Sequence, residues 1–278
     1  MGMISKVAMD TFEADHWITD VEAMMAEFAA AHSHNYQKTD RQLSALFEIG
    51  CFLALSEDYE KQGFLIEPIN TRDGEFRYLT TPNGDPRNFS HVRLARGNRI
   101  FEIRQQVRVR SYLNKEIYIT PDMVVLHSDS TILGERDEDY AGGKRGFFVT
   151  SSTSVVAAHE CKSMNGFPEL YVSFLGMVAV IHPWYNSLSQ SALERGEVGH
   201  LAPSLFVGAE ASNLHRRLIR ALEEQFAINI ITGLHREGKI SNRSSNLVRL
   251  PFADRPDLSP VDFGISEAYE VADVDIPF

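Results

Sequence analysis

The chain has 278 residues, of which 44% are hydrophobic and 23% are charged, so it is long enough to bury one large core or two modest ones. No apolar run reaches the roughly 18 residues that a membrane-spanning helix needs, and we expect no membrane partner. The net charge of −11 argues against indiscriminate binding to nucleic acid, although the charge is unevenly distributed.

Two helices are expected before the first strand. The first covers residues 15–32, where apolar residues recur at three- and four-residue steps. The second begins at Thr39, which has the spacing of a capping box with Gln42. Its expected apolar face contains Leu43, Leu46, Phe47, Gly50, Leu53 and Ala54. A short strand, "GFLIEPI", follows, and then a turn-rich segment with Asp-Gly and Asn-Gly pairs.

The middle of the chain predicts strands. "IFEIRQQVRVRSYL" alternates, which predicts one strand with apolar residues on one face and arginines on the other. "EIYITPDMVVLH" predicts the next strand, and "FFVTSSTSVVAAHECKS" predicts another after a loop rich in charge and glycine. We then expect a buried helix in "GFPELYVSFLGMVAVIHPW", a strand in "PSLFVGA", a helix in "ASNLHRRLIRALEEQ" and a strand in "FAINIITGL".

This order predicts an α/β fold in which a mixed central sheet is flanked by helices on both faces. We expect an N-terminal helical extension in residues 1–38, the core in residues 39–241 and an acidic irregular tail in residues 242–278. Cys51 and Cys161 lie in apolar runs, which predicts two buried, reduced thiols. With no secretory signal visible, these thiols favour a cytoplasmic location.

The segment "VVAAHECKSM" begins as a buried strand and then places Glu160 and Lys162 one residue apart. Residues two apart share a face of a strand, so Val156, Ala158, Glu160 and Lys162 should form one row. Asp122, in "TPDMVV", stands at the start of the preceding apolar strand. Phosphodiester hydrolysis needs carboxylates that hold divalent cations and a cationic or basic group near the attacking water. The simpler interpretation is an ion pair at the end of a strand.

Pro121-Asp122 followed by Glu160-x-Lys162, on two strands with a helix after the second, resembles the PD-(D/E)XK nuclease superfamily. This resemblance implies a restriction-endonuclease-like core and a Mg²⁺-dependent nuclease, with Mn²⁺ able to substitute. It implies that Asp122 and Glu160 hold the metal and that Lys162 positions or deprotonates the attacking water. DNA is the expected substrate, and restriction or phage defence is the expected setting.

The resemblance also assigns a role to Glu48, because many members of the superfamily add a glutamate from the helix before the strands. Glu48 is the only charge between Ala45 and Leu55. A lone carboxylate in such surroundings is costly unless it is paired or bound to metal, and a buried arginine partner is the alternative. The chain departs from the recombination-nuclease branch, which carries a Gln and a Tyr on the helix after the Lys strand. Here that helix offers Glu169 and Tyr171.

A basic block runs from Arg87 to Arg110, with seven arginines and a single acid, Glu102. Arginine suits contacts with phosphate because its planar guanidinium donates two parallel hydrogen bonds. An ordinary solvated strand face is the alternative. The candidate nucleic-acid-binding residues are Arg93, Arg96, Arg99, Arg104, Arg108 and Arg110.

Two other functions stay open. The chain could be a non-catalytic nucleic-acid-binding module on the same fold, or a metal-dependent hydrolase of another phosphate ester such as a nucleotide. The expected partners are nucleic acid and further copies of the chain. His159 is expected to be a core histidine rather than a metal ligand, because it points away from Glu160 on a regular strand. The role of His127 at the end of the Asp122 strand stays open.

Overall fold

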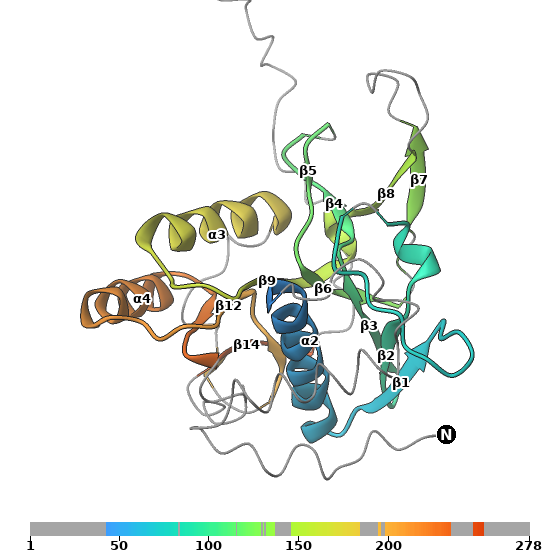
Figure 1. Ribbon diagram of the computed structural model, residues 1–278, viewed down its shortest axis with the longest axis horizontal. Helices are drawn as coiled ribbons and strands as arrows, with labels where there is room; N and C mark the ends of the chain where they lie inside the picture. The colour runs from blue at the N-terminus through green and yellow to red at the C-terminus, as the bar shows by residue number, and fades with distance from the viewer. Residues whose placement is uncertain are drawn as a thin grey trace, which may run out of the picture.

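A mixed sheet of seven strands, in the order β1-β2-β3-β6-β9-β12-β13, forms the centre of the molecule (Figure 1). The computed structural model describes residues 43–82, 84–114, 116–128, 130, 132–136, 146–183, 194–195, 198–234 and 247–252. The expected α/β class, with a mixed central sheet flanked by helices, is confirmed. The helix predicted in residues 15–32 lies outside the described residues. Among those described, no helix has the length and apolar character needed to cross a membrane.

The elements before the middle of the chain are α2 (Leu43–Lys61), β1 (Leu65–Ile69), the 3-10 helix η2 (Pro86–Asn88), β2 (His91–Arg96), β3 (Arg99–Gln105), β4 (Arg108–Arg110), β5 (Tyr118–Ile119) and β6 (Met123–His127). They are followed by β7 (Leu133–Arg136), β8 (Gly146–Ser151), η3 (Ser152–Ser154), β9 (Val155–Lys162), α3 (Pro168–Ile181), β10 (Glu194–Arg195), β11 (His200–Leu201), β12 (Ser204–Val207), α4 (Asn213–Gln225), β13 (Asn229–Ile231) and β14 (Val248–Leu250).

The central sheet is antiparallel on one side and parallel on the other. β1, β2, β3, β6 and β9 pair antiparallel in that order. β9, β12 and β13 pair parallel, and the helices α3 and α4 provide the two crossovers that parallel neighbours require. β6 and β9 are therefore antiparallel neighbours, which brings the start of one strand beside the end of the other.

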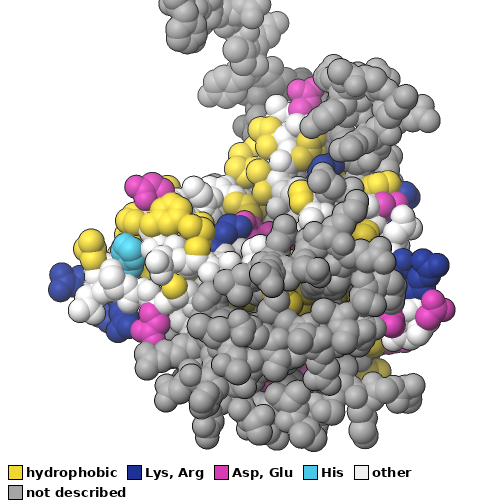
Figure 2. Space-filling model, viewed as in Figure 1, with side chains coloured by type: hydrophobic (Ala, Val, Ile, Leu, Met, Phe, Trp, Pro, Cys, Tyr) yellow, Lys and Arg dark blue, Asp and Glu magenta, His cyan; other side chains and the backbone are white. Residues whose placement is uncertain are grey.

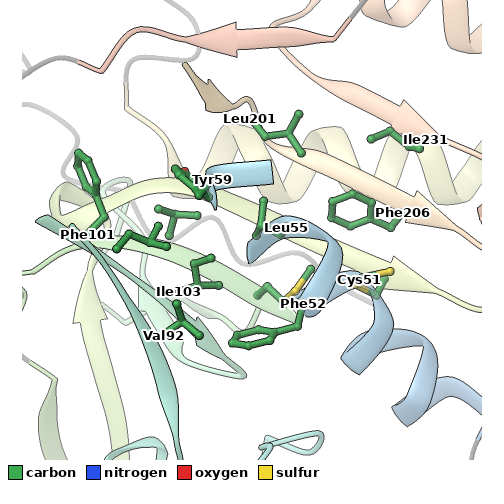
Figure 3. Packing of buried hydrophobic residues seen from close by; sticks show 14 of the residues in the cluster. Cys51, Phe52, Leu55, Tyr59, Val92, Phe101, Ile103, Leu201, Phe206 and Ile231 are labelled. Carbon is green, nitrogen blue, oxygen red and sulfur yellow. The ribbon is translucent and has the colours of Figure 1, made fainter. Parts of the chain in front are cut away.

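α2 covers one face of the sheet and contributes Cys51, Phe52, Leu55 and Tyr59 to the main core cluster (Figure 3). The apolar face predicted for this helix is wrong, because Leu53 was expected on it and is 38% exposed. The reason lies in the composition: from Ala45 to Leu55 the helix is apolar almost all round, so periodicity does not select a face. The sheet selects it instead.

α3 and α4 cover the other face above β12 and β13, in a second core cluster. The α3 side chains Tyr171, Phe174, Val178 and Ile181 are buried. The expectation of a fully buried helix is only partly met, because Val172 is 60% exposed. Figure 2 shows hydrophobic side chains exposed at the surface over α3.

Two segments that were expected to be continuous strands are each divided. Residues 100–113 turn at Gln106, whose φ of 52° belongs to the left-handed region, and β3 and β4 consequently enter different sheets. η3 similarly separates β8 from β9. β4 and β8 belong to a four-stranded sheet with the order β5-β4-β8-β7, which projects from the central sheet in Figure 1.

The C-terminal strand β14 lies between β10 and β11 in a three-stranded sheet. It falls within the segment that was predicted to be an irregular tail, so residues 248–250 have regular structure and the division into three segments stays a prediction. Arg249 is 1% exposed, and its Nη1 and Nη2 donate to the Asp58 carboxylate on α2 at 2.8 and 2.7 Å. This buried pair fastens the C-terminal strand to the helix that carries Glu48.

We expect Arg249→Met to lower the free energy of unfolding by about 3–5 kcal/mol, because it leaves the buried Asp58 charge without its partner. Lys61→Ala is the control: it breaks the exposed 2.6 Å ion pair with Glu57 on the same helix and should cost only about 0.3–0.5 kcal/mol. Urea denaturation of the two variants measures both values. Equal, small losses would show that the Asp58–Arg249 pair does not hold β14 in place.

Candidate functional site

The start of β6 and the end of β9 bring Asp122 and Glu160 together. Met123 pairs with His159, which places Asp122 opposite Glu160, and the Asp122 N–H donates to Glu160 Oε2 at 3.4 Å. The row predicted along β9 is correct only in part. The β6–β9 register shifts between Val125 and Leu126, so Val156 packs against the main core cluster while Ala158 belongs to the cluster on the other face.

Lys162 joins the two carboxylates. Its Nζ lies 2.5 Å from Glu160 Oε1 and 3.3 Å from Asp122 Oδ2. Burial by itself would lower the pKa of Lys162, but the negative charges of Asp122 and Glu160 outweigh it and raise the pKa above the usual value of 10.5. Lys162 is therefore an ammonium ion at neutral pH in this arrangement.

Asp122 is 8% exposed, and several hydrogen-bond donors hold its carboxylate. Its Oδ2 accepts from the Cys161 N–H at 2.8 Å, and its Oδ1 accepts from Gln106 Nε2 at 3.0 Å. Cys161 lies on β9 and Gln106 directly follows β3, and these are the two strands that flank β6. The neighbouring strands therefore set the orientation of the Asp122 carboxylate. Cys161 and Cys51 are both free and buried, as predicted.

Glu48 reaches the same cluster from α2, where its Oε2 accepts from Gln106 Nε2 at 3.3 Å. Burial and, second, the negative charge of Asp122 raise the pKa of Glu48 to about 8. Gln106 and Lys162 act in the opposite direction and lower it. The hydrogen-bond partner of Glu48 is thus an amide within the site, where the alternative interpretation expected an arginine.

Gln106 is a site residue that the sequence interpretation missed. Its side-chain amide donates to both Glu48 and Asp122, and its own N–H donates to the Asp122 carbonyl oxygen at 3.1 Å. Alternation assigned Gln106 to the arginine face, and nothing in the sequence marks a glutamine for positive φ. A strained backbone conformation of a non-glycine residue is frequent at functional sites.

The three carboxylates have the chemistry of a site for a hard divalent cation. The charge of Asp122 raises the pKa of both Glu48 and Glu160, although burial is the larger cause for each, so an added positive charge would relieve their repulsion. Within the part of the chain that the structure describes, no group of three or more His, Cys, Asp or Glu side chains forms a ready metal site. Mg²⁺ commonly needs only one or two protein carboxylates, together with water and substrate phosphate. Asp122 and Glu160 are two carboxylates at adjoining strand ends, and in the present arrangement both contact Lys162 Nζ.

The six candidate arginines do not share one strand face. Arg104 donates from Nε to Glu102 at 2.6 Å, and Arg93 lies 3.4 Å from Glu67. Other arginines lie over aromatic rings: Arg96 over Phe64, Arg99 over Phe252 and Arg110 over Tyr118, at 5.8, 5.8 and 5.7 Å from the ring centroids. Arg108 begins β4 in the smaller sheet. Nucleic-acid binding by these residues stays a prediction, but the single arginine strand on which it was based does not exist.

The two histidines beside the site differ. His159 is fully buried, its ring packs against Phe206 at 5.7 Å, and burial lowers its pKa to about 3. It is therefore a neutral core side chain. His127 ends β6 with its ring 5.7 Å from that of Phe101, at the opposite end of the strand from Asp122.

No protein-family model matches this chain, and neither a curated protein nor a solved structure matches it. The functional argument therefore depends on the geometry of the site and on the motif.

We expect Glu48→Gln to change how stability depends on pH in metal-free protein. With a folded-state pKa of about 8 against an ordinary 4.5, Glu48 contributes stability that is complete below pH 4.5 and is lost as the pH rises through 8. The variant has no such titration, so its melting temperature relative to wild type should increase between pH 5 and pH 9. Thermal melts in EDTA measure this, with Glu57→Gln on the same helix as the control. A constant difference between Glu48→Gln and wild type would contradict a buried, charge-crowded Glu48.

Proposed function

We propose that this protein is a divalent-metal-dependent nuclease that hydrolyses phosphodiester bonds, with DNA as the expected substrate. The observation that carries the proposal is the convergence of Asp122, Glu160 and Lys162 at the adjoining ends of β6 and β9. Two carboxylates and an ammonium group from neighbouring central strands are the groups that the reaction needs from a protein.

The order of elements around these residues supports a restriction-endonuclease-like core. A helix carries Glu48, the β6 region carries Asp122, β9 carries Glu160 and Lys162, and α3 and β12 follow. This is the sequence of elements expected from the PD-(D/E)XK motif. The antiparallel pairing of β6 with β9 and the parallel pairing of β9 with β12 make the central sheet mixed, as that core requires.

Asp122 and Glu160 would hold the metal ion, with Glu48 as a supporting carboxylate. When bound, Mg²⁺ neutralises charge on the phosphate and lowers the pKa of a coordinated water. Asp122 is already oriented by Cys161 N–H and Gln106, so little reorganisation of that side chain is needed.

The proposed role of Lys162 in the reaction follows from its positive charge. Because the neighbouring carboxylates keep it protonated, it is unsuited to removing a proton from water in the present arrangement. It can instead donate a hydrogen bond to the attacking water or to the phosphate oxygens. Positioning the water, rather than deprotonating it, is thus the favoured of its two expected roles.

The test is incubation of purified protein with plasmid, linear duplex DNA, single-stranded DNA, RNA and nucleotides, each with Mg²⁺, Mn²⁺ or EDTA. Cleavage of DNA with either metal and none in EDTA is the expected result. Binding of DNA with no cleavage under any condition would favour the non-catalytic module. Hydrolysis of nucleotides alone would favour the other phosphate-ester hydrolase.

Lys162→Ala should lower the turnover rate by about 10²–10⁴-fold while metal and substrate still bind, because its contribution belongs to the transition state. Asp122→Ala should abolish cleavage and also weaken metal binding. Lys61→Ala, which removes a surface ion pair on α2, is the matched control and should cleave at the wild-type rate. If Lys162→Ala also cleaves at that rate, Glu160 and Lys162 form only an ion pair.

A further inference from the structure

A second group of polar side chains surrounds a pocket of about 220 Å³ beside the edge of the central sheet. None of its residues belongs to the carboxylate cluster, which consists of Glu48, Asp122 and Glu160 with Lys162. The pocket is lined by Asn70, Arg87, His91, Arg104, Ser130 and Ile132.

Arg104 of the pocket lies on the same face of the sheet as Glu160 and Lys162. Ile103 and Met123 belong to the core cluster under α2, and so does Cys161. Because successive side chains of a strand point to opposite faces, Arg104 and Glu160 face away from α2, whereas Asp122 precedes β6 and is joined to Glu48 of α2 through Gln106. Val124, which pairs with Arg104 on this face, is fully buried in a core cluster with Val107 and Val109, so the smaller sheet covers the face between the two sites.

Along the sheet, the pocket and Asp122 lie toward opposite ends of β6. Arg104 pairs with Val124 of β6, two residues after Asp122. The Arg104 guanidinium, however, is directed toward Glu102, which pairs with Leu126, and Ser130 and Ile132 of the pocket follow the end of β6. A nucleic-acid strand with one phosphate at Asp122 would therefore reach the pocket through a more distant phosphate of the same strand.

Two guanidinium groups in the pocket are held in fixed planes. Arg104 donates from Nε to Glu102 at 2.6 Å, and its Nη2 lies 3.0 Å from His91 Nε2. Burial and, second, the charge of Arg104 lower the pKa of His91 to about 4, so a neutral ring can accept this bond at pH 7.

Arg87 is fixed in a similar way. Its Nε and Nη2 donate to the Asp85 carboxylate at 3.1 and 3.0 Å, and its guanidinium lies 4.2 Å from the Phe148 ring centroid. Both arginines therefore keep Nη1 without a hydrogen-bond partner among the described residues. The buried Ser130 Oγ, also in the pocket wall, likewise has no partner among the residues described.

We propose that this pocket binds a phosphate group of the nucleic-acid strand that is cleaved at Asp122 and Glu160, an inference that rests on the proposed nuclease function. Planar guanidinium donors fit phosphate oxygens, and Asp85 and Glu102 keep those donors oriented before the ligand arrives. Because these carboxylates also offset the positive charge, the site relies on direct hydrogen bonds rather than on long-range attraction.

The first experiment measures binding of inorganic phosphate to the full chain in EDTA at fixed ionic strength, by calorimetry or NMR. Arg87→Ala should weaken binding by at least about tenfold, the effect of losing a charge-assisted hydrogen bond. Arg104→Gln should do the same. Arg216→Ala, which removes an exposed arginine paired with Glu210 at 3.2 Å on α4, should leave binding unchanged. Equal affinity in all four proteins would overturn the proposal.

Arg104 is 14% exposed in its side chain and its loss leaves Glu102 unpaired, so Arg104→Gln can lose stability. The Arg87 side chain is 52% exposed, so Arg87→Ala should stay folded and provides the decisive variant. A melting curve of each variant shows whether it is folded. Unchanged phosphate binding in a folded Arg87→Ala protein counts against the pocket.

A second experiment distinguishes the source of the phosphate with short oligonucleotides that carry a 5′-phosphate or a 5′-hydroxyl. Preference for the 5′-phosphate that disappears in Arg87→Ala identifies a terminal phosphate. Equal weakening of both oligonucleotides in Arg87→Ala identifies an internal phosphodiester. If Arg87→Ala binds both oligonucleotides as wild type does, the pocket does not contact the strand and the proposal is wrong.

The outcomes separate this inference from the proposed function. Cleavage of DNA by wild type and by Arg87→Ala with equal KM values would preserve the nuclease and overturn the pocket. Phosphate binding that depends on Arg87, in a protein that cleaves no nucleic acid, would preserve the anion site and overturn the nuclease.

Discussion

The ammonium group of Lys162 is shared by carboxylates that the sheet forces together. Asp122 lies opposite Glu160 because β6 and β9 are antiparallel neighbours, and burial deprives both of the water that would screen their repulsion. Gln106 links Glu48 to this pair, and Glu48 adds a third negative charge only as the pH rises through its pKa of about 8. Such an arrangement costs stability unless positive charge compensates it, and Lys162 provides only one charge. A divalent cation would complete the compensation, which is the physical reason for treating the cluster as a metal site.

The pocket at Arg87 and Arg104 is the proposed binding site for a phosphate of the substrate. The break at Gln106 sends the chain from the central sheet into the smaller one, and the same residue holds Glu48 and Asp122. Phe148 of β8 in the smaller sheet supports Arg87, whereas Arg104 stays on β3 of the central sheet. The turn at Gln106 therefore places Arg108 and Arg110 in the smaller sheet, while Arg104 stays on the central sheet beside the pocket.

The resemblance to a known motif suggested Glu48, Asp122, Glu160 and Lys162, and the two-residue repeat of a strand predicted that Glu160 and Lys162 share one face. One failure came where a single backbone conformation decided the outcome, and two others had different causes. Gln106 adopts positive φ without being glycine, and this ended a strand that alternation had predicted to continue. The face of α2 was missed because the helix is apolar almost all round, and Arg249 was missed because its partner Asp58 lies 191 residues away.

The most direct measurement of the central claim is a calorimetric titration of metal-free protein with Mn²⁺. Wild type should bind the ion, and Asp122→Asn and Glu160→Gln, which keep the shape of each side chain and remove its charge, should each weaken binding at least about tenfold. Lys162→Ala should retain binding or strengthen it, because the ammonium competes with the ion for the same oxygens. Mn²⁺ affinity that is the same in wild type and in both carboxylate variants would contradict the claim that these residues form a metal site.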